Sequence, residues 1–333
     1  MAEVRIDPLS GHRTIIAGER SRRPGGAPSC SVADPIDPES DPFAEGHEDR
    51  TPPELFAVRP DGGPADSPHW TVRVVPNLYP ALTPAPQQPD AELPGEGGRS
   101  APDLFASLPA SGAHEVIING PQSVLSLAEL PAQQAIAAIE VWRERMRAHE
   151  SSPYVQLIVN ERREAGASLP HTHAQLYALD FVPAAVARER ERAAAYTTQT
   201  MGHNLLGDLV AEEVRRGERI VAIDDDAVLL APWASRLPYQ LMLAPRRPRA
   251  RFEAPGASGG ALLHEGLRRL ARHLGSSPPL NMWVRTAPRG ADDFCWRIDV
   301  MPRLTHLAGL ELSTELNLNI VSPEDAAAAL RGA

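Results

Sequence analysis

The sequence predicts an α+β fold in which two similar halves, residues 1–181 and 182–333, form one antiparallel sheet flanked by helices. Three observations favour this fold class. The order strand, strand, helix, strand, loop, strand occurs twice along the chain. The connections are mostly too short for parallel crossovers, which need about a dozen residues or more. The 333 residues are 42% hydrophobic, which is enough for two domains or one large duplicated unit.

The first half contains the clearer copy of this repeat. Alternating apolar residues predict strands at 70–75 and 114–118. Apolar residues at helical spacing, with a charged opposite face, predict a helix at 128–149. Two further strands are expected at 154–159 and 171–179, and the loop between them is rich in Gly, Ala and Ser.

The second half has the same order in a weaker form. Strands are expected at 227–231, 239–243, 280–284 and 295–300, and a helix at 259–274. Two charged helices, at 183–195 and 204–216, separate the two copies. The repeated order indicates an old duplication of one α+β unit.

Charge and cysteine content restrict the partners and the location. The net charge of −10 argues against a nucleic-acid-binding protein, which usually has a basic face. No apolar run is long enough to cross a bilayer, and the N-terminus lacks the apolar stretch of a signal peptide, so no membrane partner is expected. Two distant cysteines, Cys30 and Cys295, indicate a reducing cytoplasm. Because the chain has no lysine, a side-chain cation that binds phosphate must be Arg or His.

The strongest local signal is the run GASLPHTHAQ at residues 166–175. If the chain is extended there, the two-residue period places His171, His173 and Gln175 on one face. The loop before them can bring backbone N–H groups and the Ser168 hydroxyl against phosphate oxygens. In one interpretation the histidines bind a metal. In another, one histidine attacks phosphorus while its neighbours stabilise the phosphoryl oxygens. The third is an ordinary surface strand with two histidines.

This run resembles the active-site motif of the galactose-1-phosphate uridylyltransferase family, a branch of the histidine-triad superfamily, whose pattern is His-x-His-x-Gln. Other segments resemble the family in the same order along the chain. They are 5–11, 20–24, 73–82, 112–118, 301–304 and 308–311. The resemblance covers most of the chain and implies two histidine-triad-like halves, the first with the catalytic motif and the second degenerate.

The resemblance implies a two-step transfer through a covalent nucleotidyl-histidine, for which no cofactor is required. His173 is then the nucleophile, Gln175 steadies the transferring phosphoryl group, and Ser168 completes the catalytic set. The residues that would surround the nucleotide are Arg20, Arg23, Asn77, Asn160 and Gly166. Covalent transfer through histidine predicts ping-pong kinetics.

The zinc site of the family is altered in this sequence. Many members bind zinc through a Cys-Pro-x-Cys segment, a later His-Glu and the first motif histidine. Here Asp41 and Ala44 replace the two cysteines, whereas His114 and His171 are retained. Asp41, His114 and His171 remain as candidate zinc ligands, since carboxylate and imidazole both bind zinc.

A second metal site in some relatives uses a glutamate and three histidines. Glu189 stands at the glutamate position, and Arg285, Cys295 and Arg297 stand at the histidine positions. Guanidinium groups beside a carboxylate replace the charge of a cation with an ion pair. We therefore expect Glu189 to pair with Arg285 or Arg297 in a metal-free site.

The side of the site that binds the sugar phosphate also departs from the family. Thr305 and Leu310 stand where the family has a lysine and a tyrosine, whereas Glu311 is retained and Asn317 replaces a glutamine. The main expectation is transfer of a nucleoside monophosphate between a nucleotide sugar and a sugar 1-phosphate. One alternative is a nucleotide-sugar phosphorylase, which uses inorganic phosphate as the acceptor, or a hydrolase. Another is a non-catalytic nucleotide-binding relative.

Two further properties complete the expectation. Members of the family form dimers whose sites borrow residues from the neighbouring subunit, so a homodimer is expected. The base of the nucleotide, uridine or adenosine, is left open, because the resemblance implies a base pocket made largely of backbone and apolar contacts.

Overall fold

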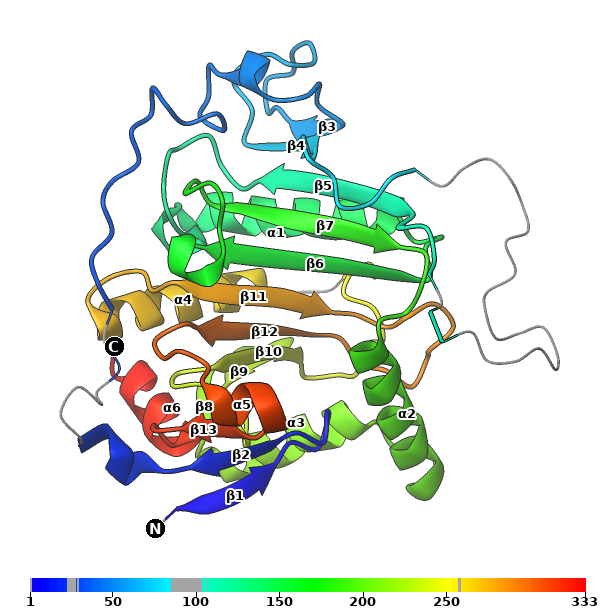
Figure 1. Cartoon of the computed structure of the whole chain (residues 1–333), viewed down its shortest axis with the longest axis vertical. Helices are drawn as coiled ribbons and strands as arrows, with labels where there is room; N and C mark the ends of the chain where they lie inside the picture. Colours follow the sequence, from blue (N-terminus) through cyan, green and yellow to red (C-terminus); the bar gives the residue numbers. More distant parts are fainter. Residues whose placement is uncertain (1, 23–27, 29, 85–103, 106, 257–258) are drawn as a thin grey trace, which may run out of the picture.

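A computed structural model describes residues 2–22, 28, 30–84, 104–105, 107–256 and 259–333 (Figure 1). Its centre is a ten-stranded sheet in which all neighbouring strands are antiparallel. The strands, in their order across the sheet, are β3 (Phe56–Val58), β4 (Val72–Pro76), β5 (Gly112–Ile118), β7 (His173–Leu179), β6 (Tyr154–Glu161), β11 (Leu280–Arg285), β12 (Arg297–Pro302), β10 (Leu241–Pro245), β9 (Ala227–Leu230) and β8 (Ile220–Ile223).

The two halves of the sequence meet at the pair β6 and β11, where Asn160 lies opposite Asn281. Strands from residues before 182 lie on one side of this pair, and strands from later residues lie on the other. The predicted single antiparallel sheet is thereby confirmed. The boundary at 181–182 falls between β7 and the next helix, and the division into two domains there stays a prediction.

One face of the sheet is apolar and packs against helices, which lie behind the strands in Figure 1. Helix α1 (Ala132–Ala148) begins after Pro131, and its residues Ala135, Ile139, Trp142 and Met146 follow helical spacing and are almost fully buried. The Trp142 indole N–H donates to the Asn119 side-chain oxygen at 2.9 Å. Helices α4 (Gly260–Leu274) and α6 (Pro323–Arg331) contribute to the same core.

The other face carries His173 and Gln175 together with smaller apolar clusters, and smaller elements cover its C-terminal part. These are a three-stranded sheet and three helices: β1 (Glu3–Ile6), β2 (Arg13–Ile16), β13 (Asn317–Asn319), α2 (Ala184–Gln199), α3 (Leu205–Arg216) and α5 (Gly309–Thr314). Four short 3-10 helices complete the description: η1 (Gly18–Arg22), η2 (Glu48–Arg50), η3 (Leu127–Glu129) and η4 (Arg163–Ala165). None of the helices among the described residues has the length and apolar character to span a membrane.

The expected strand at 171–179 begins two residues late, at His173. Thr172 donates its backbone N–H to the Val124 carbonyl at 2.8 Å, and the His171 ring binds the Gly120 carbonyl. The segment before β7 is therefore held by residues 120–124, which removes it from the two-residue period of the strand. The expected strand is therefore two residues shorter, whereas the rings of His171 and His173 both lie against Phe43, with 6.0 Å and 5.3 Å between the ring centroids.

Glu161, the last residue of β6, is buried beneath the segment that enters α1. Its carboxyl accepts hydrogen bonds from the Ser126 hydroxyl (2.6 Å) and the Leu127 N–H (2.7 Å). Burial nevertheless raises the pKa of Glu161 to about 7. Because this value lies above the value of an unfolded glutamate, the folded protein holds the proton more tightly, and protonation stabilises the fold.

The stabilisation by the Glu161 proton is expected to amount to about 3 kcal/mol below about pH 4.5 and to be lost as the pH rises through about 7. Glu161→Gln keeps the shape of the side chain and does not titrate. The free energy of unfolding of the wild type minus that of the variant should therefore fall between about pH 5 and pH 8. Urea titrations at several pH values measure this difference, and a pH-independent difference would contradict the assignment.

Candidate active site

His173 opens β7 between β5 and β6, and its ring is buried. Ring nitrogen Nδ1 lies 2.7 Å from the His171 carbonyl oxygen. A carbonyl only accepts hydrogen bonds, so Nδ1 carries the proton and Nε2 has the free lone pair. Burial lowers the pKa of His173, which favours the neutral ring at neutral pH. The ring is therefore fixed in the tautomer and charge state of a nucleophile, with the edge of Phe43 against it at 5.3 Å between centroids.

Gln175 lies on the same face of β7, two residues further along. Its side-chain oxygen accepts from the Tyr177 hydroxyl (2.9 Å) and lies 3.1 Å from His114 Nε2. Because His114 Nδ1 accepts the Ala81 backbone N–H (3.1 Å), Nε2 of that ring carries the proton and donates to Gln175. Both bonds fix the amide so that its NH₂ group is left to donate to a ligand.

Asn77 joins this network from the segment after β4. Its backbone N–H donates to the His114 carbonyl at 2.9 Å, and its side-chain nitrogen lies 3.1 Å from His114 Nε2, a contact between two donors and not a hydrogen bond. Its side-chain oxygen accepts the Tyr79 N–H at 2.9 Å. The structure thus places Asn77 beside Gln175 through His114.

Asn160 lies on β6 beside His173. The register pairs Ile158 with Gln175 and Val159 with Ala174, so Asn160 comes next, alongside His173. Its side-chain oxygen accepts from the Asn281 side chain at 2.8 Å, and the same Asn281 nitrogen donates to the Ala165 carbonyl at 2.7 Å. Asn281 therefore connects Asn160 to the loop before β7, a role that sequence reasoning missed, although an Asn within the apolar strand at 280–284 was a visible signal.

The loop at 162–170 contains Gly166 and Ser168. Gly166 has a φ of +90°, a left-handed conformation that favours glycine. The backbone N–H groups of Gly166 and Ala167 donate within the loop, to the carbonyls of Arg163 (2.9 Å) and Arg162 (3.2 Å). These two groups are not available to phosphate oxygens, which corrects part of the sequence-based expectation. Ser168 is exposed in the same loop.

Asp41 and His171 form a fully buried ion pair. Burial raises the pKa of Asp41, but hydrogen bonds from His171 and Ser123 outweigh it and hold the pKa below its ordinary value. The carboxylate oxygen Oδ2 lies 2.7 Å from His171 Nδ1 and 2.6 Å from the Ser123 hydroxyl. His171 Nε2 lies 2.8 Å from the Gly120 carbonyl oxygen. Both partners of the ring are oxygen acceptors, so both ring nitrogens are engaged within the protein.

The candidate zinc ligands do not fit a metal ion. A metal ligand needs a free lone pair, and both nitrogens of His171 are engaged within the protein. His114 instead stacks on Tyr177, with 4.1 Å between the ring centroids, and binds Gln175. Within the described ranges, no group of three or more His, Cys, Asp or Glu side chains is placed to hold a metal ion. The third member of the Asp41–His171 cluster is Ser123, which sequence reasoning did not identify.

The Asp41–His171 pair supports the nucleophile, because the His171 carbonyl accepts the Nδ1 proton of His173. Asp41→Asn removes the carboxylate that holds the buried His171 ring, and we expect it to lower the free energy of unfolding by about 3 kcal/mol. Ser123→Ala keeps the ion pair and removes one hydrogen bond, so its loss should be near 1 kcal/mol. Urea unfolding of the two variants measures both values. Equal losses would contradict the ion pair.

Glu189, in α2, pairs with two arginines, which confirms the expected ion pair. Its Oε2 atom lies 3.0 Å from Arg297 Nη2 and 3.4 Å from Arg285 Nε. Asp299 also binds Arg297, at 3.0 Å. Burial raises the pKa of the Cys295 thiol to about 11, so this group stays protonated.

Three of the remaining site residues lie away from His173 within one chain. Arg20 lies in η1, Glu311 in α5 and Asn317 in β13, all beside the C-terminal part of the large sheet, whereas β7 lies in its N-terminal part (Figure 1). Glu311 accepts the Ala308 backbone N–H at 2.9 Å and so caps its own helix. Arg23 lies outside the described residues.

Two family models match the chain. The model described as "Galactose-1-phosphate uridyl transferase, N-terminal domain" matches residues 2–183. A domain of unknown function, DUF4921, matches residues 132–331.

Curated relatives are similar over most of the chain. An ADP-glucose phosphorylase from Arabidopsis thaliana is 28% identical over 342 residues, which cover 99% of this chain and 92% of the relative. A galactose-1-phosphate uridylyltransferase from Neurospora crassa is 25% identical, and the match covers 98% of this chain and 94% of the relative. The galactose-1-phosphate uridylyltransferase from Rattus norvegicus is 28% identical, and the match covers 73% of this chain and 60% of the relative.

Solved structures show the same fold. The crystal structure of an ADP-glucose phosphorylase from Arabidopsis thaliana with bound ADP-glucose superposes with a TM-score of 0.78, at 24% identity, and covers 100% of this chain and 99% of its own. A "galt-like" protein from the same plant superposes with a TM-score of 0.75, at 25% identity, and covers 99% of this chain and 98% of its own. The family model covers more than half of the sequence and includes the whole of the His173 site except Asn281. The chain belongs to the galactose-1-phosphate uridyl transferase family, a family of transferase enzymes.

Proposed function

We propose that the protein transfers a nucleoside monophosphate from a nucleotide sugar to a phosphate acceptor through a covalent intermediate on His173. The observation that carries this proposal is the His173 ring, which donates through Nδ1 to a carbonyl and keeps the Nε2 lone pair free. Gln175 lies on the same strand face with its amide NH₂ available. A neutral nucleophile beside an oriented donor suits attack on phosphorus.

The first step forms a bond between His173 Nε2 and the α-phosphorus and breaks the bond from that phosphorus to the bridging oxygen. The sugar 1-phosphate leaves with the electron pair of the broken bond. Gln175 donates to a non-bridging oxygen, where charge accumulates in the transition state. In the second step an oxygen of the acceptor phosphate attacks the same phosphorus, and the His173–phosphorus bond breaks.

The acceptor in the main form of the proposal is a sugar 1-phosphate, as the family name implies. A second candidate is phosphorolysis, in which inorganic phosphate is the acceptor and a nucleoside diphosphate is the product. The similarity to an ADP-glucose phosphorylase over 99% of the chain favours it. Leu310, an apolar residue next to Glu311, is consistent with fewer polar contacts to a sugar phosphate.

We propose that the active unit is a homodimer in the cytoplasm. Arg20, Glu311 and Asn317 lie away from His173 within one chain, so any contribution they make to the same substrate requires a second copy. Mixing a His173→Ala variant with a Glu311→Ala variant tests this arrangement. Recovery of activity in the mixture, when each variant alone is inactive, would support shared sites, and no recovery would contradict them.

The acceptor is tested by incubation with ADP-glucose or UDP-glucose and either inorganic phosphate or galactose 1-phosphate. The main proposal predicts a new nucleotide sugar with galactose 1-phosphate, and phosphorolysis predicts ADP or UDP with inorganic phosphate. Double-reciprocal plots should be parallel in either case, as expected for a ping-pong reaction. Intersecting plots would argue against the covalent route.

A further inference from the structure

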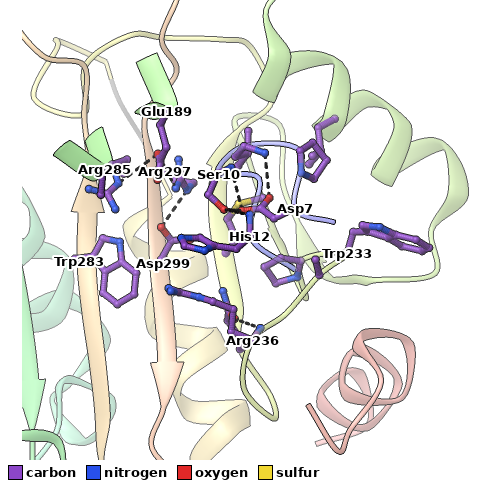
Figure 2. Close-up of a pocket in the computed structure, with 18 of the residues that line it drawn as sticks. Asp7, Ser10, His12, Glu189, Trp233, Arg236, Trp283, Arg285, Arg297 and Asp299 are labelled. Carbon is purple, nitrogen blue, oxygen red and sulfur yellow. Dashed lines mark hydrogen bonds and ion pairs between the residues drawn. The ribbon is translucent and has the colours of Figure 1, made fainter. Parts of the chain in front are cut away.

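A second polar cavity, of about 140 Å³, lies in the C-terminal half of the protein (Figure 2). Trp283 on β11 and Asp299 on β12 form one wall, and Arg236, from the segment between β9 and β10, forms another. His12, from the turn between β1 and β2, also lines it. The volume is below the roughly 300–1,000 Å³ of pockets for drug-sized ligands, so the cavity suits a group of a few atoms.

The cavity opens on the same face of the sheet as the catalytic residues. The register pairs Gln175 with Ile158, Ile158 with Trp283, and Trp283 with Asp299. Directly paired residues project to the same face of a sheet. Trp283 is two strands from Gln175, a separation of roughly 10 Å at the usual strand spacing. The cavity is therefore separate from the position of the reacting phosphorus.

The charges that line the cavity leave an excess of cations. Four arginines and three carboxylates line it: Arg188, Arg236, Arg285, Arg297, Asp7, Glu189 and Asp299. Glu189 and Asp299 are bound by arginines of the set, and Asp7 accepts the backbone N–H groups of Leu9 (3.1 Å) and Ser10 (3.2 Å). Of the described carboxylates, none lies within 4.0 Å of Arg188 or Arg236 as an ion-pair partner.

Arg236 and Trp283 both have donors without a strong acceptor. Arg236 donates through Nη2 to the Met301 sulfur at 3.1 Å, and sulfur is a weak acceptor. Its guanidinium carbon lies 5.9 Å from the centre of a Trp283 ring. Burial lowers the pKa of Arg236, which reflects the cost of this charge in the interior. The Trp283 indole N–H is buried and has no hydrogen-bond partner among the described residues.

We propose that this cavity binds a phosphate group, as inorganic phosphate or as a phosphomonoester, through the Arg236 guanidinium, beside the Trp283 ring. Arg188, which is exposed, lies at the edge of the cavity and contributes to attraction of the anion. The bound group supplies the direct ion-pair partner that Arg236 does not have among the described carboxylates. The occupant is not the acceptor of the transfer reaction, because it lies two strands from Gln175.

The test is a binding measurement that does not depend on catalysis. Protein with 5-fluorotryptophan is titrated with inorganic phosphate at constant ionic strength, and the ¹⁹F resonance lost in Trp283→Phe identifies that indole. Phosphate should shift the Trp283 resonance in the wild type and equally in His173→Ala. Sodium chloride should not shift it. A Trp283 resonance that does not respond to phosphate or to glucose 1-phosphate would overturn the proposal.

Arg236→Met is the matched variant, because it keeps the length of the side chain and removes the charge. Phosphate should bind at least about tenfold more weakly to it. Without phosphate, its melting temperature should equal or exceed that of the wild type, because a largely desolvated charge without a direct ion-pair partner is gone. An unchanged phosphate affinity in this variant would overturn the proposal, and Arg236→Gln, measured by calorimetry, gives the same test if Arg236→Met does not fold.

Two titrations identify the source of the phosphate group. A response to inorganic phosphate alone would indicate the free anion. A tighter response to glucose 1-phosphate would indicate a phosphomonoester. Both outcomes support a phosphate site, and their order decides which compound class occupies it.

Discussion

His173→Ala is expected to abolish transfer in both directions, with kcat reduced by at least about 10⁴-fold. The imidazole forms the bond to phosphorus, and no neighbouring side chain can replace it in the buried space between β5 and β6. The loss should appear in kcat more than in the binding of the nucleotide sugar, because the residue acts on the reacting phosphorus. Initial rates and a separate equilibrium binding measurement distinguish the two effects.

An exposed histidine provides the control for this variant. His203 lies at the surface with its side chain 63% exposed, so His203→Ala should keep wild-type kcat. The melting temperature of His173→Ala, measured beside that of His203→Ala, separates a loss of catalysis from a loss of folded protein. Substantial activity in His173→Ala would contradict the nucleophilic role.

Gln175→Ala is expected to reduce kcat by about 10²- to 10³-fold, the usual cost of removing one oriented donor to a developing oxyanion. The two bonds at its side-chain oxygen fix the amide before substrate arrives, so little reorganisation accompanies the reaction. The covalent intermediate should still form, more slowly. Rapid-quench measurement of the first step quantifies this effect.

Tyr177→Phe is the matched control for Gln175, because it removes one of the two bonds that orient the amide and leaves the amide in place. His114 still holds the Gln175 oxygen at 3.1 Å, so a loss of about tenfold or less is expected. A loss in Tyr177→Phe as large as that in Gln175→Ala would indicate a direct role for the tyrosine.

Much of the N-terminal half could be predicted from the sequence, because its signals are local. The two-residue period places His173 and Gln175 on one strand face, as the structure shows, and Asn160, which the family resemblance implied, lies alongside His173 on the next strand. The predicted ion pair of Glu189 is also present, because a carboxylate near two arginines is stabilised by pairing with them.

Other features depend on contacts between distant segments, which spacing does not reveal. Ser123 binds Asp41 from 82 positions away, and Asn281 reaches the catalytic loop from the second half of the chain. Because His171 faces Asp41 and Gly120, the strand begins at His173 and not at the first histidine of the motif. The zinc expectation depended on a common location for His114 and His171, and tertiary hydrogen bonds place them in different networks.

The central claim is that His173 carries a nucleoside monophosphate, and the mass of the intact protein tests it most directly. The wild type is incubated with ADP-glucose or UDP-glucose, without an acceptor, and analysed without acid, since a bond between phosphorus and histidine is labile in acid. The account predicts an added mass of one AMP or UMP that is absent in His173→Ala and disappears on addition of the acceptor. Turnover of a nucleotide sugar with no adduct on the wild type, or an equal adduct on His173→Ala, would contradict it.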